Sequence, residues 1–483
     1  MIITETLKSE ISALISGNHM YDSYYKIWRD CLESYLGGEE YRRAQNLVRY
    51  QLENNNEYLQ RLKYTPLINH CQSVISVYNS FLFREPPHRE FGSIENLPEL
   101  KDFMKDADFE GKSLNQFMKD VSIWSSVFGH CFIFVTKSNI NANNRAEEYN
   151  AGVRPYVSII NPIMVLDWDY QRQASGRYEL VYIKYLEDVN GDVRTVKKWY
   201  PDRIETTVVD VKKDEIVSEE VVPNQLGKIP AVLAYNKQST FRGIGVSDIQ
   251  DIKDCQRFIY NCISEIRESI AMDTHPSLCA TNEVNIGTGP GSIIRLPDNL
   301  PGDLKPYALE FNGGSIDKIY QAIERTEQAI DKMANTGAVR ATEVKGPMSG
   351  VAMETEFQLL NAKLSEKADN LELAEEQMWK LWCEYQGTTW DGEIEYPGSF
   401  NIRDTQNEIV QLKTARETTN NPTIQKQIDY RIMEWLGMEE KDYEDTDDTY
   451  QTHTMMSPDG QKVTVTTMEQ HNELVAQGYL MGE

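Results

Sequence analysis

The sequence predicts an α+β protein, because a helical pattern and a strand pattern occupy different stretches of the chain. Between residues 243 and 385, apolar residues recur at spacings of three and four, which is the period of an α-helix. Between residues 156 and 235 the period changes to two, in runs rich in β-branched and aromatic side chains. We therefore expect long helices together with a meandering antiparallel sheet.

The first 80 residues are expected to be mostly helical. Apolar residues keep a helical period from Ile11 to Leu32, and Gly37 and Gly38 interrupt it. Aromatic residues are frequent here, with arginines between them, a combination that also occurs in proteins that stack single-stranded nucleic acid. Because the aromatic spacing follows the helix and acidic residues are interspersed, packing in the core and between subunits is the expected role.

Capping and helix-breaking residues locate the next elements. The pair at 86–87 is Pro-Pro, which closes a helix that starts near Leu67. Ser113 with Gln116 fits a capping box, which opens a helix that ends near Phe128. The elements expected next are a strand at 131–136, a polar surface loop at 139–152, and the sheet, with turns at 190–191 and 213–214.

Three long helices are expected between residues 243 and 385. The first runs from Gly243 to about Met272, with Ser247 and Gln250 as a capping box, and His-Pro at 275–276 ends it. The second runs from 315 to a glycine at 337, and the third from 351 to about 385. At ~1.5 Å per residue these helices span roughly 33 to 50 Å.

Each of these helices carries one apolar stripe. The stripes consist of Ile249, Ile252, Cys255, Ile259, Cys262, Ile266 and Ile270 in the first helix; Ile316, Ile319, Ile323, Thr326, Ile330 and Met333 in the second; and Met353, Phe357, Leu360, Leu364, Leu371, Met378 and Trp382 in the third. Asp248, Asp251, Asp254, Arg257, Glu265 and Glu268 occupy other faces of the first helix. Stripes of coiled-coil width indicate long rods that pack against neighbouring helices.

The C-terminal part is expected to be helical and then to form a hairpin. Two amphipathic helices are predicted at 404–418 and 423–436, followed by an acidic linker at 439–448. Asp459-Gly460 predicts a hairpin turn, with residues 462–466 as one arm.

Several short runs share their order and spacing with one known family. They are FRGIGVSD at 241–248, DCQRFIYN at 254–261, Ser264-Glu265, HPSL at 275–278 and MSGVA at 348–352, with YLGG at 35–38, Tyr41-Arg42 and FLFREPP at 81–87 in support. In this order they resemble the portal proteins of tailed bacteriophages, over roughly residues 20 to 410.

The resemblance implies a portal-type subunit, with an α+β wing, a two-helix stem, a small α/β clip, a long wing helix and a mainly helical C-terminal crown-like region. The implied boundaries are 1–242 for the wing, 243–275 and 315–336 for the two stem helices, 276–314 for the clip, 337–350 for the tunnel loop, 351–403 for the long wing helix and its return segment, 404–445 for the crown-like helices and 446–483 for a hairpin-helix tail.

The resemblance also implies which residues have functional positions. The channel and tunnel-loop residues are Val339, Arg340, Thr342, Glu343 and Lys345, and the clip residues that face the terminase and connector are Glu283, Asn285, Arg295 and Asp298. The stem-packing residues are Ile259, Ile266, Ile316, Ile319, Ile323 and Ile330. Arg340 and Lys345 are the basic groups of the loop that are able to touch phosphate.

As a member of this family, the chain is expected to form a dodecameric ring at one capsid vertex, through which DNA is packaged and later ejected. The implied partners are the terminase large subunit, the head–tail connector or adaptor, the major capsid protein, and double-stranded DNA in the channel. The implied location is the virion, and the host cytoplasm during assembly. No cofactor, metal or membrane is implied.

Composition and charge agree with this expectation. A chain of 483 residues with 40% hydrophobic and 26% charged residues is ordinary for a soluble protein of several domains, and no apolar run approaches the ~18 residues of a membrane span. Seven scattered cysteines indicate reduced thiols and not a disulfide framework. The net charge of −26 suits a conduit that DNA passes without sticking, although acidity also serves solubility alone.

The sequence contains no catalytic constellation. Neither an HExxH nor a GxSxG motif is present, and the carboxylate pair Asp167 and Asp169 is of a kind that arises by chance among 75 acidic residues. The alternative function is a structural scaffold that does not handle DNA and assembles through its helical seams. A metal-dependent hydrolase is a third possibility.

Overall fold

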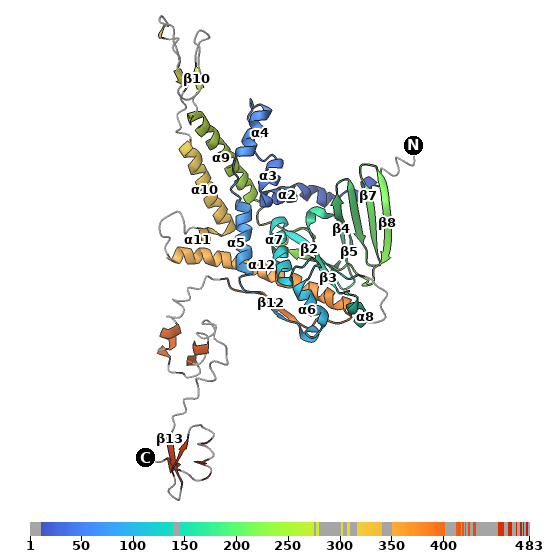
Figure 1. Ribbon diagram of the computed structural model, residues 1–483, viewed down its shortest axis with the longest axis vertical. Coiled ribbons are helices and arrows are strands. Elements are labelled where there is room, and N and C mark those ends of the chain that lie inside the picture. Colours follow the sequence, from blue (N-terminus) through green and yellow to red (C-terminus); the bar gives the residue numbers. More distant parts are fainter. Residues whose placement is uncertain are drawn as a thin grey trace. The chain divides into compact units, whose positions relative to one another are not determined.

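The computed structural model describes residues 11–138, 145–274, 277–279, 301–302, 307–309, 316–340 and 350–400, together with short stretches between 412 and 481. Contacts divide the chain into two compact units, Met1–Asn401 and Ile402–Glu483. Figure 1 labels the elements. The first unit contains long helices and antiparallel sheets, so the predicted α+β class is confirmed.

The N-terminal half of the first unit is mainly helical, as predicted. Its helices are α2 (His19–Leu36), α3 (Gly38–Arg43), α4 (Asn55–Tyr64), α5 (His70–Leu82), α6 (Pro98–Lys105), α7 (Leu114–Phe128) and α8 (Arg145–Asn150). Gly37, with φ of 64°, separates α2 from α3. The predicted capping box of Ser113 and Gln116 opens α7. The prediction of a loop at 139–152 is wrong for residues 145–150, which form the short helix α8.

The stretch predicted as one meander contributes to two antiparallel sheets, and the smaller sheet also contains the strand predicted at 131–136. The larger sheet consists of β4 (Val165–Arg172), β5 (Tyr178–Asn190), β6 (Val193–Trp199), β7 (Arg203–Asp210) and β8 (Glu215–Pro223), in sequence order. The smaller one has β2 (His130–Thr136) between β3 (Tyr156–Ile160) and β9 (Ala231–Tyr235). Because β2 is buried along almost its whole length, its backbone needs a partner strand on both edges.

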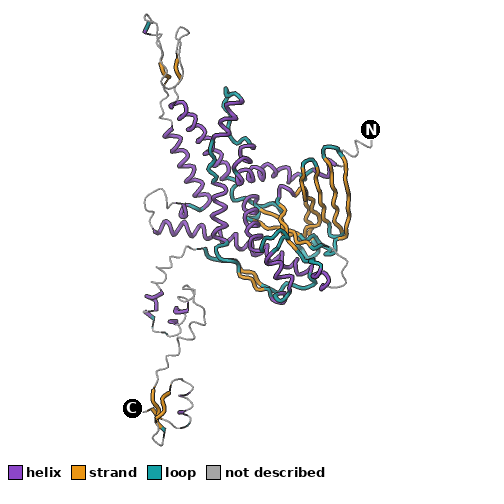
Figure 2. Tube along the Cα trace, in the orientation of Figure 1, coloured by secondary structure: helices purple, strands orange, loops and turns teal. Residues whose placement is uncertain are grey.

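The second half of the first unit contains the longest helices. They are α9 (Ile252–Thr274), α10 (Ile316–Ala334), the short α11 (Gly337–Arg340) and α12 (Gly350–Tyr385). Figures 1 and 2 show α9 and α10 side by side, and the two helices contact each other. Two short strands, β10 (Ser277–Cys279) and β11 (Tyr307–Leu309), pair antiparallel between them. After α12, the chain forms β12 (Glu393–Glu395), which pairs antiparallel with β1 (His88–Glu90) from the N-terminal half.

Three details of the predicted long helices need correction. The first helix starts at Ile252 and not near Gly243, because residues 245–248 form hydrogen bonds to other parts of the fold. Ser247 and Gln250 therefore form no capping box: the Ser247 hydroxyl accepts from the Ile249 N–H and donates to the Ser126 carbonyl. Residues 337–340, predicted as the start of a loop, form α11.

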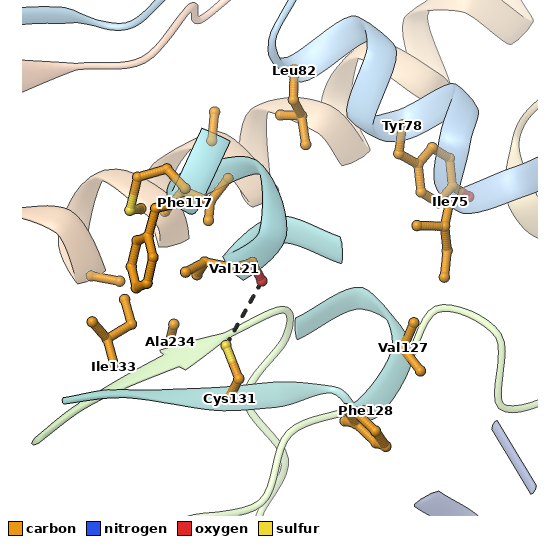
Figure 3. Close-up of a cluster of buried hydrophobic side chains, with 14 of the residues drawn as sticks. Ile75, Tyr78, Leu82, Phe117, Val121, Val127, Phe128, Cys131, Ile133 and Ala234 are labelled. Atoms are coloured by element: carbon orange, nitrogen blue, oxygen red, sulfur yellow. Dashed lines mark hydrogen bonds between the residues drawn. The ribbon is translucent and has the colours of Figure 1, made fainter. Parts of the chain in front are cut away.

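The main core lies where α5, α7, α12 and β2 meet. Figure 3 shows Phe117 and Val121 of α7 facing Cys131 and Ile133 of β2, with Ala234 of β9 beside them. The Cys131 thiol donates to the Val121 carbonyl at 3.8 Å, and its burial raises the pKa of the thiol. The aromatic N-terminal segment contributes Trp28 and Tyr41, both buried, to the core clusters, so core packing is confirmed for these two.

In the second unit, a hairpin is present where it was predicted. The strand β13 (His453–Met456) pairs antiparallel with β14 (Lys462–Val465), and β15 (Leu480–Met481) lies on the other edge of β13. The described residues 412–416 and 428–430 are helical. The rest of the two predicted helices at 404–418 and 423–436 lies largely outside the described residues.

Candidate functional site

The pair α9 and α10 packs through isoleucines that are spaced seven residues apart. Ile259 and Ile266 of α9 are 1% and 5% exposed. Ile323 and Ile330 of α10 are 8% and 0% exposed. All four belong to the main core cluster, and Ile316 and Ile319 pack against it while half-buried. The last residue of each predicted stripe is not buried: Ile270 is 47% exposed and Met333 is 43% exposed.

Polar residues in the run 254–261 connect α9 to the N-terminal helices. The side chain of Gln256 is fully buried; its oxygen accepts from the Cys71 N–H at 2.9 Å, and its amide donates to the Ser34 carbonyl at 3.1 Å. Asn261 accepts from the Val48 N–H at 2.7 Å. The two bonds of Gln256 satisfy buried backbone groups and fix the register of α9 against α2 and α5, and Asn261 ties α9 to the exposed segment at Val48.

Arg61 joins α4 to the middle of α9. Its guanidinium donates to both carboxylate oxygens of Glu53, at 2.6 and 3.0 Å, and to the Ser264 hydroxyl at 3.0 Å. It also lies 3.8 Å from the ring centroid of Tyr50. Burial raises the pKa of Glu53, but the hydrogen bonds from Arg61 and from the Tyr50 backbone outweigh burial and lower it. A two-point pair of this kind fixes orientation as well as charge.

The run at 241–248 approaches α9 as a tightly docked loop. Gly245 packs against Gly129, and a Cβ on either residue would overlap the backbone of the other. The Gly245 N–H donates to Nδ1 of His130 at 3.1 Å, and the Asp248 N–H donates to the Ser126 carbonyl at 3.0 Å. Two glycines are needed here because only a residue without a side chain allows the two backbones to touch.

A buried group of charged and polar side chains lies where this loop meets α12. Asp248 forms ion pairs with Lys367 at 2.6 Å and Lys363 at 3.3 Å. Lys367 also donates to the Ser126 hydroxyl at 2.8 Å and to the side-chain oxygen of Asn236. We call Ser126, Asn236, Asp248, Lys363 and Lys367 the polar junction.

The polar junction extends to the base of α10 through one tyrosine. Lys363 donates to the hydroxyl of Tyr78 at 2.9 Å, and that hydroxyl donates to the Ala334 carbonyl at 2.5 Å. Ala334 is the last residue of α10, where helix carbonyls lack a partner within the helix. The junction therefore links the loop before α9, the end of α10 and the middle of α12.

Electrostatics within the polar junction favour the charged carboxylate. Burial raises the pKa of Asp248, but the ammonium groups of Lys367 and Lys363 outweigh burial and lower it to about 2. For Lys367, burial lowers the pKa, and attraction to Asp248 offsets only part of this effect. For Lys363, attraction to Asp248 outweighs burial and raises the pKa. One carboxylate therefore holds two ammonium groups, so its loss would leave both without a counter-charge.

Comparison with known proteins now decides the family. A family model described as "Phage portal protein, SPP1 Gp6-like" matches residues 20–428, which is most of the chain. The chain belongs to this portal protein family. A search of curated proteins finds no match.

Three of the solved structures that align with this portal-family chain come from gene transfer agent particles. Chains from the virion of the native particle and from the neck of the empty particle, computed with C6 symmetry, are 11% and 10% identical, with TM-scores of 0.41 and 0.44. They cover 80% and 81% of this chain, and 96% and 98% of their own length is matched. A chain from the native particle's neck, computed with C12 symmetry, is 10% identical over 74% of this chain and 89% of its own, with a TM-score of 0.41.

In this portal-family chain, the tunnel-loop and clip residues predicted from the sequence are only partly within the described structure. Val339 lies in α11, half-buried, and packs against the main core cluster, and Arg340 is the last residue of that helix. Thr342, Glu343 and Lys345 lie outside the described residues, as do all four predicted clip residues, Glu283, Asn285, Arg295 and Asp298. The predicted grouping of these seven residues therefore lies outside the described residues.

The polar junction was missed by sequence analysis, although the sequence contains a signal for it. The apolar stripe of α12 leaves a gap between Leu364 and Leu371, and Lys367 occupies the missing position. A lysine on the buried face of a helix requires a buried partner. The partner is Asp248, which was predicted on a polar face of the first helix, but its side chain is only 6% exposed.

The described residues contain neither a metal-binding cluster nor a helix that could span a membrane. In that part of the chain, no three His, Cys, Asp or Glu side chains gather in a way that could hold a metal ion. Asp167 accepts a hydrogen bond from the Asn18 amide at 2.8 Å. No described helix is long and apolar enough to cross a membrane.

Proposed function

We propose that this chain assembles into a closed, dodecameric ring that forms the DNA channel at one capsid vertex. The observation that carries the proposal is the family match, which extends from residue 20 to residue 428 and so includes α3 to α12 and all but the first residue of α2. The helices α9 and α10 are suited to be the stem, because they pack against each other through one narrow seam and each keeps an exposed face, although α9 also packs against the N-terminal helices.

The proposed division of the subunit follows the described elements. The stem consists of α9 and α10, and the chain between them is the clip. Residues 337–350, which include α11, are the tunnel loop. The long wing helix is α12, and the helices and sheets before α9 are the wing. Residues 404–445 are assigned to a crown-like region and 446–483 to a tail.

The proposed partners follow from these positions. The clip binds the terminase large subunit during packaging and the head–tail connector afterwards, while the wing contacts the major capsid protein. Double-stranded DNA passes through the channel during packaging and ejection. A net charge of −26 favours passage over retention, because an acidic wall repels phosphate. The role is structural, in the virion and, during assembly, in the host cytoplasm.

Arg340 and Lys345 are the proposed contacts of the tunnel loop with the DNA backbone. Reversing both charges, Arg340→Glu with Lys345→Glu, should leave the ring intact and shorten the DNA retained in packaged particles. If particles with the double variant retain full-length DNA, the loop does not grip DNA and only connects the second stem helix to α12.

Electron microscopy of the purified protein tests the proposed function. Class averages should show closed rings with a central hole, and mass measurement should give about twelve copies. A scaffold that does not handle DNA would give monomers, open filaments or solid assemblies instead. Metal-dependent nuclease activity of the purified chain would favour the hydrolase alternative.

A further inference from the structure

The exposed face of α10 carries a stripe of basic side chains. Lys318, Arg325 and Lys332 are seven residues apart and all exposed, with Gln321 and Gln328 beside them. At 3.6 residues per turn, a spacing of seven brings side chains back to nearly the same direction. This direction is opposite to Ile323 and Ile330, which face the core. We call Lys318, Arg325 and Lys332 the basic stripe.

The exposed face of α9 has the opposite charge. Asp254 and Glu265 are exposed on it, Phe258 lies between them with 48% exposure, and Asp251 lies in the turn before the helix. We call Asp251, Asp254 and Glu265 the acidic stripe. It faces away from the isoleucine seam, so α9 and α10 of one subunit do not neutralise each other's stripes.

Most of these charges have no partner within the described part of the chain. None of the three basic side chains forms an ion pair with another described residue, and neither do Asp251 and Glu265. Asp254 pairs only with its sequence neighbour Lys253, at 3.1 Å. In a protein with far more acidic than basic residues, an unpaired basic stripe of regular spacing indicates a specific partner.

One basic and one acidic residue of the two stripes, Arg325 and Glu265, match in height along the helix pair. The helices run antiparallel, since the antiparallel strands β10 and β11 lie between them. Arg325 lies nine residues after Ile316, the start of α10, and Glu265 lies nine residues before Thr274, the end of α9. At ~1.5 Å per residue, both are about 14 Å from the shared end. Lys332 and Phe258 are each sixteen residues from that end, and Asp254 is about one turn further.

Rotation about a ring axis moves a residue around the ring without changing its height. In a ring whose stem helices run along the axis, α10 of one subunit therefore lies beside α9 of the next, with Arg325 level with the neighbour's Glu265. Exposed apolar residues also lie at matching heights on the two helices. Phe258 of α9 is level with Ala329 and Met333 of α10, which border the basic stripe. A surface that only contacts phosphate does not require such apolar neighbours.

We propose that the basic stripe of α10 binds the acidic stripe of α9 in a neighbouring copy of this chain, with Phe258 packed against Ala329 and Met333. The inference rests on the proposed ring and adds the chemistry that joins its subunits. Unlike charges at matched heights would set the vertical register between neighbours and make ring assembly sensitive to salt.

Charge reversal tests this contact, with sedimentation and mass measurement as the readout of ring formation. Arg325→Glu and Glu265→Arg should each raise the protein concentration needed for ring formation by about tenfold or more at low salt, whereas the double variant should return it to within about threefold of the wild type. Lys332→Glu with Asp254→Arg provides a second pair, at positions that differ in height by about one helical turn. Lys380→Glu, on the exposed side of α12, is the control and should leave assembly unchanged.

The outcomes separate this inference from the proposed function. If the wild type forms no rings, the proposed function fails. If the wild type forms rings but both single reversals assemble normally, or the double variant is no better than the singles, the stripe contact is overturned while the ring stands. Rings that are intact with Arg325→Glu but package less DNA would instead place the basic stripe against the phosphate backbone. Because all four positions are exposed, unchanged circular dichroism should accompany each variant.

Discussion

Gly245 packs directly against Gly129, and this contact fixes the loop before α9 to the end of α7. Gly129 has φ of 90°, in the left-handed region that favours glycine, and there is no space for a Cβ on either residue. The loop carries Asp248 into the polar junction, so the two glycines determine whether the junction can form.

Gly245→Ala should destabilise the protein strongly, because the new Cβ would overlap the Gly129 backbone and cannot move aside. We expect a loss of about 3 kcal/mol or more in the free energy of unfolding, measured by urea denaturation at fixed protein concentration. Gly398→Ala is the matched control, since nothing lies within 4 Å of its Cβ position. Equal stability of the two variants would contradict the close approach of Gly245 to Gly129.

Asp248→Asn tests the polar junction. The substitution leaves the buried ammonium groups of Lys363 and Lys367 without a counter-charge, which should cost about 3 to 5 kcal/mol. Lys380→Met breaks the exposed pair with Glu376, at 3.0 Å, and should cost less than about 1 kcal/mol. Thermal unfolding of the two variants provides the comparison, and a mild effect of Asp248→Asn would mean that the lysines are hydrated.

Stability should fall between pH 7 and pH 5 because of His130. Burial lowers the pKa of this histidine to about 3, and its Nδ1 accepts a hydrogen bond as the neutral form. In the unfolded chain the ordinary pKa is about 6.5, so the unfolded state binds the additional proton as the pH decreases through 6.5. The resulting loss between pH 7 and pH 5 is roughly 2 kcal/mol.

His130→Gln should reduce this pH dependence, because the glutamine oxygen can accept from Gly245 but does not titrate. His88→Gln provides the control, since the His88 side chain is 69% exposed. Urea unfolding at pH 7 and pH 5 measures the difference. A pH slope that is unchanged in His130→Gln would show that another group causes it.

Ile330→Asp tests the seam between α9 and α10. The side chain is fully buried, so an aspartate there would be a charge without a partner and should cost several kcal/mol and prevent ring assembly. Tyr320→Asp, on the same helix but 53% exposed, should leave the subunit folded. Normal rings with Ile330→Asp would show that the pair does not need this seam.

Much of the fold could be predicted because local signals and tertiary structure agree. The capping box at Ser113, the glycine break at Gly37 and the apolar stripe of α12 each correspond to an element that the structure contains. The start of α9 could not be predicted, because Ser247 fits a helix cap locally but forms a hydrogen bond to Ser126, a residue distant in sequence.

The candidate site was less accessible to sequence analysis than the fold. The junction joins Tyr78, Asp248 and Lys367, which are far apart in the chain, and no local period connects them. Only the lysine in the apolar stripe of α12 indicates that a buried partner exists, and it does not identify that partner. The basic stripe is visible in the sequence, but its importance depends on the exposure of α10, which only the structure provides.

A three-dimensional reconstruction of the purified assembly tests the central claim most directly. The account predicts a closed ring of about twelve subunits in which α9 and α10 surround the central hole and run along its axis. A ring whose hole is bordered by the sheet of β4 to β8, or a protein that remains monomeric at every concentration tested, would contradict it.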